Sequence, residues 1–208
     1  MRDNLFPAIC EIVDGFIGQE LTPPTGAALV RKLMDALLGY PVDVTQFAPK
    51  QVGSYTIQAE RFLDVLDQIR VLHEAHWKET EGYRHGLPFN PDYGYFLEKD
   101  ASGEYLLFTV RKDGHLVGNF GLFLNTSHHT QELVASEDTL FILPEHRVGR
   151  LYFRFSEYVD EACQTLGVSE LRTSTKLSNH SGDMLPRLGY AHVGNNYVKT
   201  FPRKNHVQ

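Results

Sequence analysis

The stretch LVASEDTLFILPEHRVGRLYFRFSEYVDEACQTL, from Leu133 to Leu166, decides the fold. Its first part, Leu133–Leu143, has strand character and runs into Pro144. A turn at His146–Gly149 follows, and then a helix. The apolar side chains of that helix recur at spacings of three and four, namely Leu151, Phe155, Tyr158, Val159, Ala162 and Leu166. Gly167 ends the helix, as a glycine after the last helical residue commonly does.

A strand that enters a helix through a tight turn offers a site for phosphate groups. The first N–H groups of a helix have no partner within it, and the positive end of the helix dipole points the same way. Arg147, Arg150 and Arg154 add positive charge at spacings of three and four, on one helix face. We therefore predict a pyrophosphate-bearing ligand at this turn. The alternative is an ordinary strand–turn–helix unit with a solvated arginine face.

The composition is that of a globular protein. The chain has 208 residues, 42% hydrophobic and 22% charged, enough for one large domain or for one domain with an extension. The net charge of −6 argues against nonspecific nucleic-acid binding by the whole chain. Cys10 and Cys163 lie far apart on apolar segments, which favours core thiols over a disulfide. No segment resembles a secretory signal or a membrane span, so we expect a reducing, cytoplasmic compartment.

Two short amphipathic helices are predicted in the first quarter of the chain. Asn4–Phe16 and Thr25–Leu38 each carry an apolar stripe, and Pro23-Pro24 separates them. Val42–Gly53 is predicted to be a linker. This quarter contains no catalytic cluster, so it is either packed on the main domain or a partner-binding arm. We favour packing, because short apolar stripes need a surface to cover.

A brief strand at Ser54–Gln58 and a long helix at Ala59–Thr80 are predicted next. The periodic inward positions of the helix are Phe62, Val65, Leu66, Ile69, Leu72 and His76. His73, His76 and Glu79 do not form a zinc motif, because HExxH places its histidines four residues apart and these are three apart. We interpret the histidines as part of a packing surface.

The remaining segments predict a mixed sheet. After the aromatic loop Gly82–Tyr95 come two strands, Tyr105–Arg111 and His115–Leu124, joined by a tight turn at Asp113-Gly114. Three more elements are predicted: a strand at Ser169–Thr175 parallel to Leu133–Leu143, a short helix at Asn179–Leu188, and a last strand at Tyr197–Phe201. This order is typical of an α/β chain whose mixed, mostly antiparallel sheet has helices on both faces.

From about Tyr55 to Phe201 the chain resembles the GNAT superfamily of acetyl-CoA-dependent N-acetyltransferases. Four stretches carry the resemblance: the hairpin LLFTVRKDGHLVGNFGLFL, the strand EDTLFILPEHR, the turn and helix after it, and MLPRLGYAHVGNNYVKT. Within the superfamily, the chain is most similar to small acetyltransferase-like proteins encoded by bacteriophages. The resemblance implies an N-terminal helical extension over residues 1–51 and an acetyltransferase domain over residues 52–208.

The resemblance implies acetyl-CoA as the cofactor. The main chain of Phe141, Ile142 and Leu143 would pair with its pantetheine arm like an added strand, and Asn179 would lie near that arm. The residues implied to bind the pyrophosphate are Arg147, Val148, Gly149, Arg150 and Leu151. The family's turn follows the pattern Arg/Gln-x-x-Gly-x-Gly/Ala. Counted from Arg147, this chain has Arg150 and Tyr152 at the two small-residue positions.

Acetyl transfer to an amine needs a base for the amine, a donor for the oxyanion and an acid for the thiolate. The resemblance implies that the base is Glu137 or Asp138 on the fourth strand. Because strand neighbours alternate, only one of them can face the cleft, and we favour Asp138. His128 or His129 is an alternative base. The structural alternative for either carboxylate is a polar residue at the strand end that bonds to a loop.

Tyr190 and Tyr197 are the candidates for the acid, and the alternative for Tyr190 is a core aromatic side chain. The implied function is acetyl transfer to a primary amine on a small molecule or a protein. The alternative function is a GNAT-fold binding protein without turnover, acting through its N-terminal helices on a macromolecular partner. No nucleic-acid or membrane partner is expected.

Overall fold

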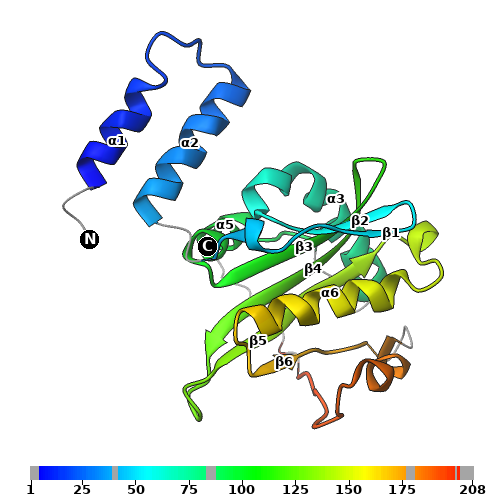
Figure 1. Ribbon diagram of the computed structural model, residues 1–208. Coiled ribbons are helices and arrows are strands. Elements are labelled where there is room, and N and C mark those ends of the chain that lie inside the picture. The colour runs from blue at the N-terminus through cyan, green and yellow to red at the C-terminus, as the bar shows by residue number, and fades with distance from the viewer. Residues whose placement is uncertain (1–4, 39–41, 83–87, 177–180, 200, 202–208) are drawn as a thin grey trace, which may run out of the picture. The chain divides into compact units, whose positions relative to one another are not determined.

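The computed structural model describes residues 5–38, 42–82, 88–176, 181–199 and 201, and the chain forms two compact units, Met1–Ser174 and Thr175–Gln208. The first unit contains a six-stranded sheet whose strands lie side by side in chain order (Figure 1). The strands are β1 (Lys50–Val52), β2 (Tyr55–Glu60), β3 (Tyr105–Lys112), β4 (His115–Thr126), β5 (Leu133–Ile142) and β6 (Glu170–Arg172). Only β5 and β6 pair in parallel. The predicted mixed, mostly antiparallel sheet is confirmed.

Helices cover both faces of this sheet. On one face, α6 (Leu151–Thr165) buries Phe155 and Val159 among side chains of β2, β3, β4 and β5. On the other face, α3 (Phe62–Thr80) and α5 (Tyr93–Ser102) enclose a second cluster that includes Tyr105 and Phe141. Figure 1 shows α6 in front of the sheet and α3 behind it. The central strands are therefore buried on both sides.

The strand patterns explain this arrangement. In β3, Leu106 and Phe108 pack toward α6, whereas Tyr105 and Leu107 pack toward α3. Side chains alternate along a strand, so a strand covered on both faces reads as a continuous apolar run. The hairpin turn is also confirmed, because Asp113 and Gly114 both have positive φ values, 50° and 81°. That pair of values suits the turns that join antiparallel neighbours through two residues.

The first quarter of the chain differs in part from the prediction. The helices α1 (Leu5–Asp14) and α2 (Pro23–Leu38) are present, and α2 begins at its prolines because proline fits the first turn of a helix. The predicted linker Val42–Gly53 is wrong, since it contains the 3-10 helix η1 (Val44–Gln46) and the strand β1. Phe47 is buried, and its carbonyl accepts from the Tyr158 hydroxyl at 3.2 Å.

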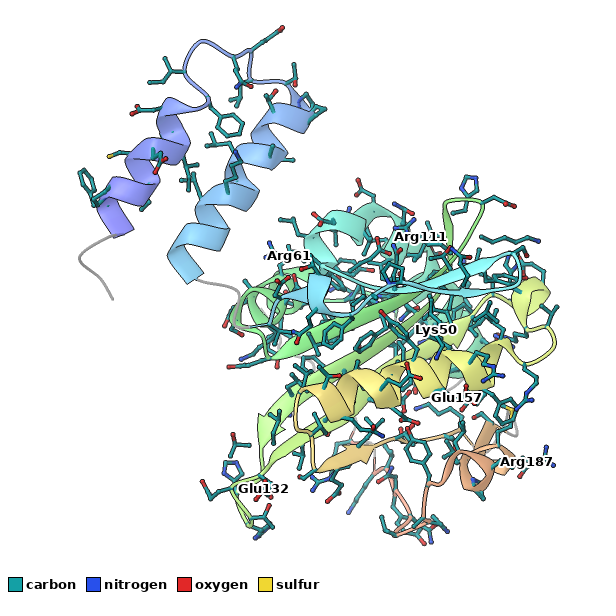
Figure 2. All side chains as sticks on the ribbon, in the orientation of Figure 1. Lys50, Arg61, Arg111, Glu132, Glu157 and Arg187 are labelled. Atoms are coloured by element: carbon teal, nitrogen blue, oxygen red, sulfur yellow. The ribbon has the colours of Figure 1, made fainter. Side chains whose placement is uncertain are left out.

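β1 also contacts α6 through its side chains. Lys50, labelled in Figure 2, donates to Glu161 of α6 at 2.8 Å. The boundary predicted after Gln51 therefore falls inside a strand of the sheet. Sequence alone missed β1 because a three-residue edge strand has no periodicity to detect.

Three further boundaries are corrected. The long helix starts at Phe62, because β2 continues to Glu60 and pairs with Leu107 of β3. Within this helix His73 is buried, whereas His76 is only half-buried. The end of the predicted loop Gly82–Tyr95 is instead the start of α5, where the Asp92 side chain accepts from the Tyr95 N–H.

The second unit has little regular structure in its described part. The predicted helix Asn179–Leu188 is, over its described residues, two 3-10 helices, η3 (Ser181–Asp183) and η4 (Leu185–Leu188). Pro186 lies well inside the predicted helix, where it would remove a backbone donor, but in the first turn of η4, a position that proline fits. The predicted strand Tyr197–Phe201 is wrong at the described residues 197–199 and 201. Tyr197 is 89% exposed and Val198 68% exposed, so this run has no buried face to hold it as a strand.

Gly121 of β4 leaves room for the largest fully buried side chain. The ring of Tyr105 contacts those of Phe62, Phe96 and Phe123, with centroids 5.7, 5.3 and 4.9 Å away. A Cβ atom at position 121 would lie 2.0 Å from the Tyr105 hydroxyl oxygen and 2.8 Å from Cζ. No real side chain tolerates such a contact, so this position requires glycine.

Gly121→Ala is expected to lower the free energy of unfolding by about 2–4 kcal/mol, because the ring of Tyr105 must move within a packed core. Adding Tyr105→Phe removes the atom nearest the new methyl group and should restore part of the loss. Urea denaturation of the single and double variants measures both effects. Gly26→Ala in α2 is the control, since its Cβ would meet only Leu21 at 3.7 Å. An equal loss in the two alanine variants would contradict the close-contact argument.

Candidate active site

The parallel pair β5 and β6 separates after three residue pairs. Val134, Ala135 and Ser136 of β5 pair with β6, and β5 then continues to Ile142. No strand in the described part of the chain pairs with that side of β5 beyond Ser136. The backbone there is available to an extended ligand, which can add to a sheet edge as a strand does.

A bulge in β5 lies next to this free edge. Gly121 of β4 pairs with Thr139 and Leu122 pairs with Glu137, so Asp138 is an extra residue without a partner on β4. In a strand without a bulge, alternation places Asp138 on the same face as Leu140 and Ile142, and this expectation from the sequence is wrong. Leu140 and Ile142 pack toward α6, whereas Asp138 contacts Tyr105 on the α3 side. The bulge reverses the alternation at this point.

The Asp138 side chain is partly buried, beside the hydroxyl of Tyr105. The Tyr105 hydroxyl donates to its Oδ2 at 3.3 Å. Burial raises the pKa of Asp138 to about 6, and the hydrogen bond from Tyr105 partly offsets that rise. A carboxyl group that titrates near neutral pH suits a general base. Next to it, Thr139 Oγ1 accepts from Asn119 Nδ2 at 2.7 Å, and this hydrogen bond joins β5 to the neighbouring strand β4.

Glu137 has a different environment. Its carboxylate accepts from the Thr173 hydroxyl and from the Ser174 N–H, the latter at 3.0 Å. These contacts join β5 to the residues after β6, beyond the point where the two strands separate. Of the two predicted carboxylates, Glu137 thus connects β5 to the residues that follow β6. Asp138 instead contacts the Tyr105 hydroxyl.

The turn to α6 leaves a helix N-terminus exposed. After the 3-10 helix η2 (Pro144–His146), Gly149 adopts a φ of 56°, which favours glycine, and the helix begins at Leu151. The N-cap residue Arg150 makes no side-chain capping bond. Val148, Gly149 and Arg150 are exposed. The Leu151 N–H donates to the Val148 carbonyl at 3.2 Å, so the N–H groups that can meet an anion are those of Gly149 and Arg150 and those just after Leu151.

The three arginines of this region have different partners. Arg154 pairs with Glu157 at 2.7 Å. Arg147 pairs with Glu79 of α3, also at 2.7 Å, and so does not extend along the face of α6. Arg150 is exposed at the start of the helix. Only part of the predicted arginine stripe thus points toward a ligand at the turn.

The described structure does not test several of the predicted site residues. Tyr190 and Tyr197 belong to the second unit, and Asn179 lies outside the described residues, so their roles stay predictions. His128 and His129 are exposed in the β4–β5 connection. At a rise of about 3.3 Å per residue, the start of β5 at Leu133 is about 17 Å from Asp138. A direct role of these histidines beside Asp138 is not supported.

Two features of the site were not found from the sequence, namely the bulge and the Tyr105 hydroxyl. In the sequence, Tyr105 is marked only by its hydroxyl group at the start of an otherwise apolar run. Over the described residues, no group of three or more His, Cys, Asp or Glu side chains could hold a metal ion. No helix in the described ranges is long and apolar enough to cross a membrane.

In sequence, the chain matches no protein-family model and no curated protein. In structure, it is similar to a ribosomal-protein-alanine N-acetyltransferase from Brucella melitensis biovar Abortus 2308 (TM-score 0.56, 15% identity, covering 71% of this chain and 99% of that chain). It is also similar to a GNAT family acetyltransferase of Staphylococcus aureus (TM-score 0.52, 16% identity, 71% and 99%). The fold is that of the GNAT acetyltransferases.

A third similar structure contains a bound analog. It is that of AAC(6')-Iy in complex with the bisubstrate analog CoA-S-monomethyl-acetylneamine (TM-score 0.55, 17% identity, covering 72% of this chain and 98% of that chain). At such identities the similarity shows the fold alone. The chemistry of this chain has to be argued from its own residues.

Asp138→Asn is expected to stabilise the protein at high pH. The carboxyl titrates near its ordinary value of 3.8 in the unfolded chain and at about 6 in the folded protein. The raised pKa means that ionisation of Asp138 opposes folding. This penalty is absent below about pH 4, and it grows as the pH rises through 6. The variant should gain about 1–3 kcal/mol at about pH 8 and nothing at about pH 4, measured by urea denaturation at each pH.

Asp67→Asn is the matched control, because the Asp67 side chain is 95% exposed on α3. It should change stability little at either pH. Destabilisation of Asp138→Asn at about pH 8 would contradict the raised pKa.

Proposed function

We propose that this protein is an acetyl-CoA-dependent N-acetyltransferase that acts on a primary amine. The observation that carries the proposal is the free edge of β5, which leads through a short turn to the uncapped N-terminus of α6. Asp138, with its raised pKa, lies on the bulge of the same strand. A backbone edge, an anion site and a base thus follow one another along a single strand–turn–helix unit.

The residues present suit acetyl-CoA. Amide groups of its pantetheine arm can pair with the free edge of β5 at Ile142, between Phe141 and Leu143. Its phosphates can meet the N–H groups of Gly149 and Arg150, since those of Val148 and Leu151 already donate to the carbonyls of His146 and Val148 at 2.9 and 3.2 Å. Arg150 stands where the family pattern has a small residue, and its exposed guanidinium adds positive charge to this turn. When bound, the cofactor supplies an acetyl group activated as a thioester.

The chain's own residues would handle the protons. Asp138 accepts a proton from the amine, directly or through a water molecule, and the Tyr105 hydroxyl holds its carboxylate in place. Glu137 keeps the residues after β6 in position through Thr173 and Ser174. Tyr190 and Tyr197 stay our candidates for the acid that protonates the thiolate. The bacteriophage origin and the cytoplasmic location stay predictions.

Acetyl-CoA should raise the melting temperature of the protein. A ligand that binds only the folded state at 100 times its Kd stabilises by about 2.7 kcal/mol. For a chain of this size the shift is about 5–10 °C. Arg150→Glu, which places negative charge at the start of α6, should weaken cofactor binding about tenfold. Arg70→Glu makes the same charge change on α3 and should leave the shift unchanged.

A second readout addresses the chemistry. Wild-type protein incubated with acetyl-CoA and a panel of primary amines should release free thiol with at least one of them. Asp138→Asn should slow that release by about 10²–10⁴-fold while it still binds acetyl-CoA. An equal rate in the variant would remove Asp138 as the base.

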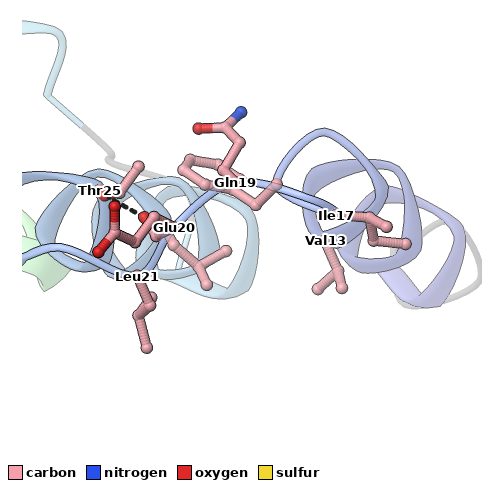
Figure 3. Close-up of a pocket in the computed structure, with 8 residues that line it drawn as sticks. Val13, Ile17, Gln19, Glu20, Leu21 and Thr25 are labelled. Atoms are coloured by element: carbon pink, nitrogen blue, oxygen red, sulfur yellow. Dashed lines mark hydrogen bonds between the residues drawn. The ribbon is translucent and has the colours of Figure 1, made fainter.

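The second candidate function is a binding protein without turnover that uses its N-terminal helices. It is favoured by α1 and by the connection from α1 to α2, where Phe6, Ile17 and Leu21 are 75%, 72% and 76% exposed. The turn between these helices also forms a hollow lined by Val13 and Leu29, among others (Figure 3). No melting shift at millimolar acetyl-CoA would favour this function. A truncation that tests it should begin at residue 42, because Phe47 and β1 belong to the sheet and its core.

A further inference from the structure

Three contacts hold the side chain of Arg147 against the end of β5. Its Nε donates to the Ile142 carbonyl at 2.7 Å. A terminal nitrogen donates to Glu79 Oε2 at 2.7 Å, and Glu79 belongs to the last turns of α3. The guanidinium also lies over the ring of Phe141, 5.3 Å from its centroid. The side chain thus bridges the turn, the strand edge and a helix on the α3 face.

The Ile142 carbonyl belongs to the free edge of β5. The Leu143 N–H donates to the Val117 carbonyl of β4 at 2.9 Å. In a trans peptide unit the C=O and the following N–H point in opposite directions, so the Ile142 carbonyl points away from β4. That is the side on which β6 no longer pairs with β5. The last carbonyl that an added strand would use already has a donor.

We propose that Arg147 is a plug that competes with the pantetheine arm of the cofactor for the Ile142 carbonyl, and that Glu79 holds the plug in place. The inference rests on the proposed binding of acetyl-CoA. It gives Arg147 a role opposite to the pyrophosphate ligand predicted from the sequence, because Arg147 must leave Ile142 before the arm can pair along the whole edge.

The contacts allow such an exchange. The Arg147 and Glu79 side chains are 42% and 32% exposed, and ion pairs exposed to this degree contribute little. The backbone carbonyl loses one donor and gains another when an amide of the arm replaces the guanidinium. α3 supplies Glu79, so the contacts at the end of that helix depend on whether Arg147 or a ligand is bonded to the Ile142 carbonyl.

A second contact connects α3 to the end of β5. The ring of His76, one turn before Glu79, lies 5.3 Å from the ring of Phe141. Phe141 is therefore contacted by a residue of α3 and by the plug itself. Release of Arg147 changes the contacts at the C-terminal end of α3. A probe at that end of α3 can therefore report whether a ligand occupies the edge of β5.

The test compares two ligands on two variants by isothermal titration. Coenzyme A carries the pantetheine arm, whereas adenosine 3′,5′-bisphosphate carries phosphates without it. Glu79→Gln removes the charge that holds Arg147, so coenzyme A should bind about two- to fivefold more tightly. The affinity for the bisphosphate should stay unchanged. Glu74→Gln is the matched control, because Glu74 pairs with Lys78 on the same helix at 2.7 Å.

Arg147→Met provides a second test that keeps an unbranched stem against Phe141 while it removes every donor. It should also tighten coenzyme A binding, and a thermal melt checks that each variant is folded. Weaker coenzyme A binding by Arg147→Met would show that Arg147 contacts the ligand and would overturn the plug.

The outcomes separate the plug from the proposed function. Coenzyme A binding that is equal or weaker in Glu79→Gln, with clear binding by the wild type, overturns the plug and leaves the function standing. Binding by Glu79→Gln but not by the wild type supports the plug. Binding by neither the wild type nor either variant overturns the proposed cofactor and the plug with it.

Discussion

The extra residue in β5 is the constraint on which the site depends. Without Asp138, Glu137 and Thr139 would continue the regular alternation, and no carboxyl group would reach the Tyr105 hydroxyl. With it, one carboxylate lies among the aromatic side chains of the α3 face, and the other reaches the residues after β6. A single insertion in the ladder thus gives two adjacent acidic residues different surroundings.

The surroundings of Asp138 lower the stability of the folded protein when the carboxyl group is ionised, but they suit a general base. A buried carboxylate is unfavourable unless hydrogen bonds replace its water, and Tyr105 replaces only part of it. Gly121 shows how closely the fold is arranged around this contact, because no larger residue fits beside the hydroxyl. A chain selected for stability alone has no reason to retain this arrangement. Active sites commonly retain such unfavourable groups.

The elements that the sequence predicts well are those defined by local signals. The hairpin follows from Asp113-Gly114, and α6 from its apolar repeat, because both depend on residues near one another in the chain. The parallel position of β6 follows from the handedness of crossover connections. The bulge cannot be predicted in this way, because it depends on the register between two strands. The hydrogen bond of Tyr105 to Asp138 and the contact of Arg147 with Glu79 join residues that are distant in sequence.

The short pairing of β6 has a consequence for dynamics. β6 is attached by three residue pairs and by the carboxylate of Glu137, whereas β4 and β5 pair along most of their length. Local opening needs the least free energy where the fewest contacts break, so the seam between β5 and β6 should be among the first parts of the sheet to exchange, together with β1, which also pairs through three residues. The edge of β5 that would admit an extended ligand thus borders a weakly paired strand, and the two strands can separate further without unfolding the core.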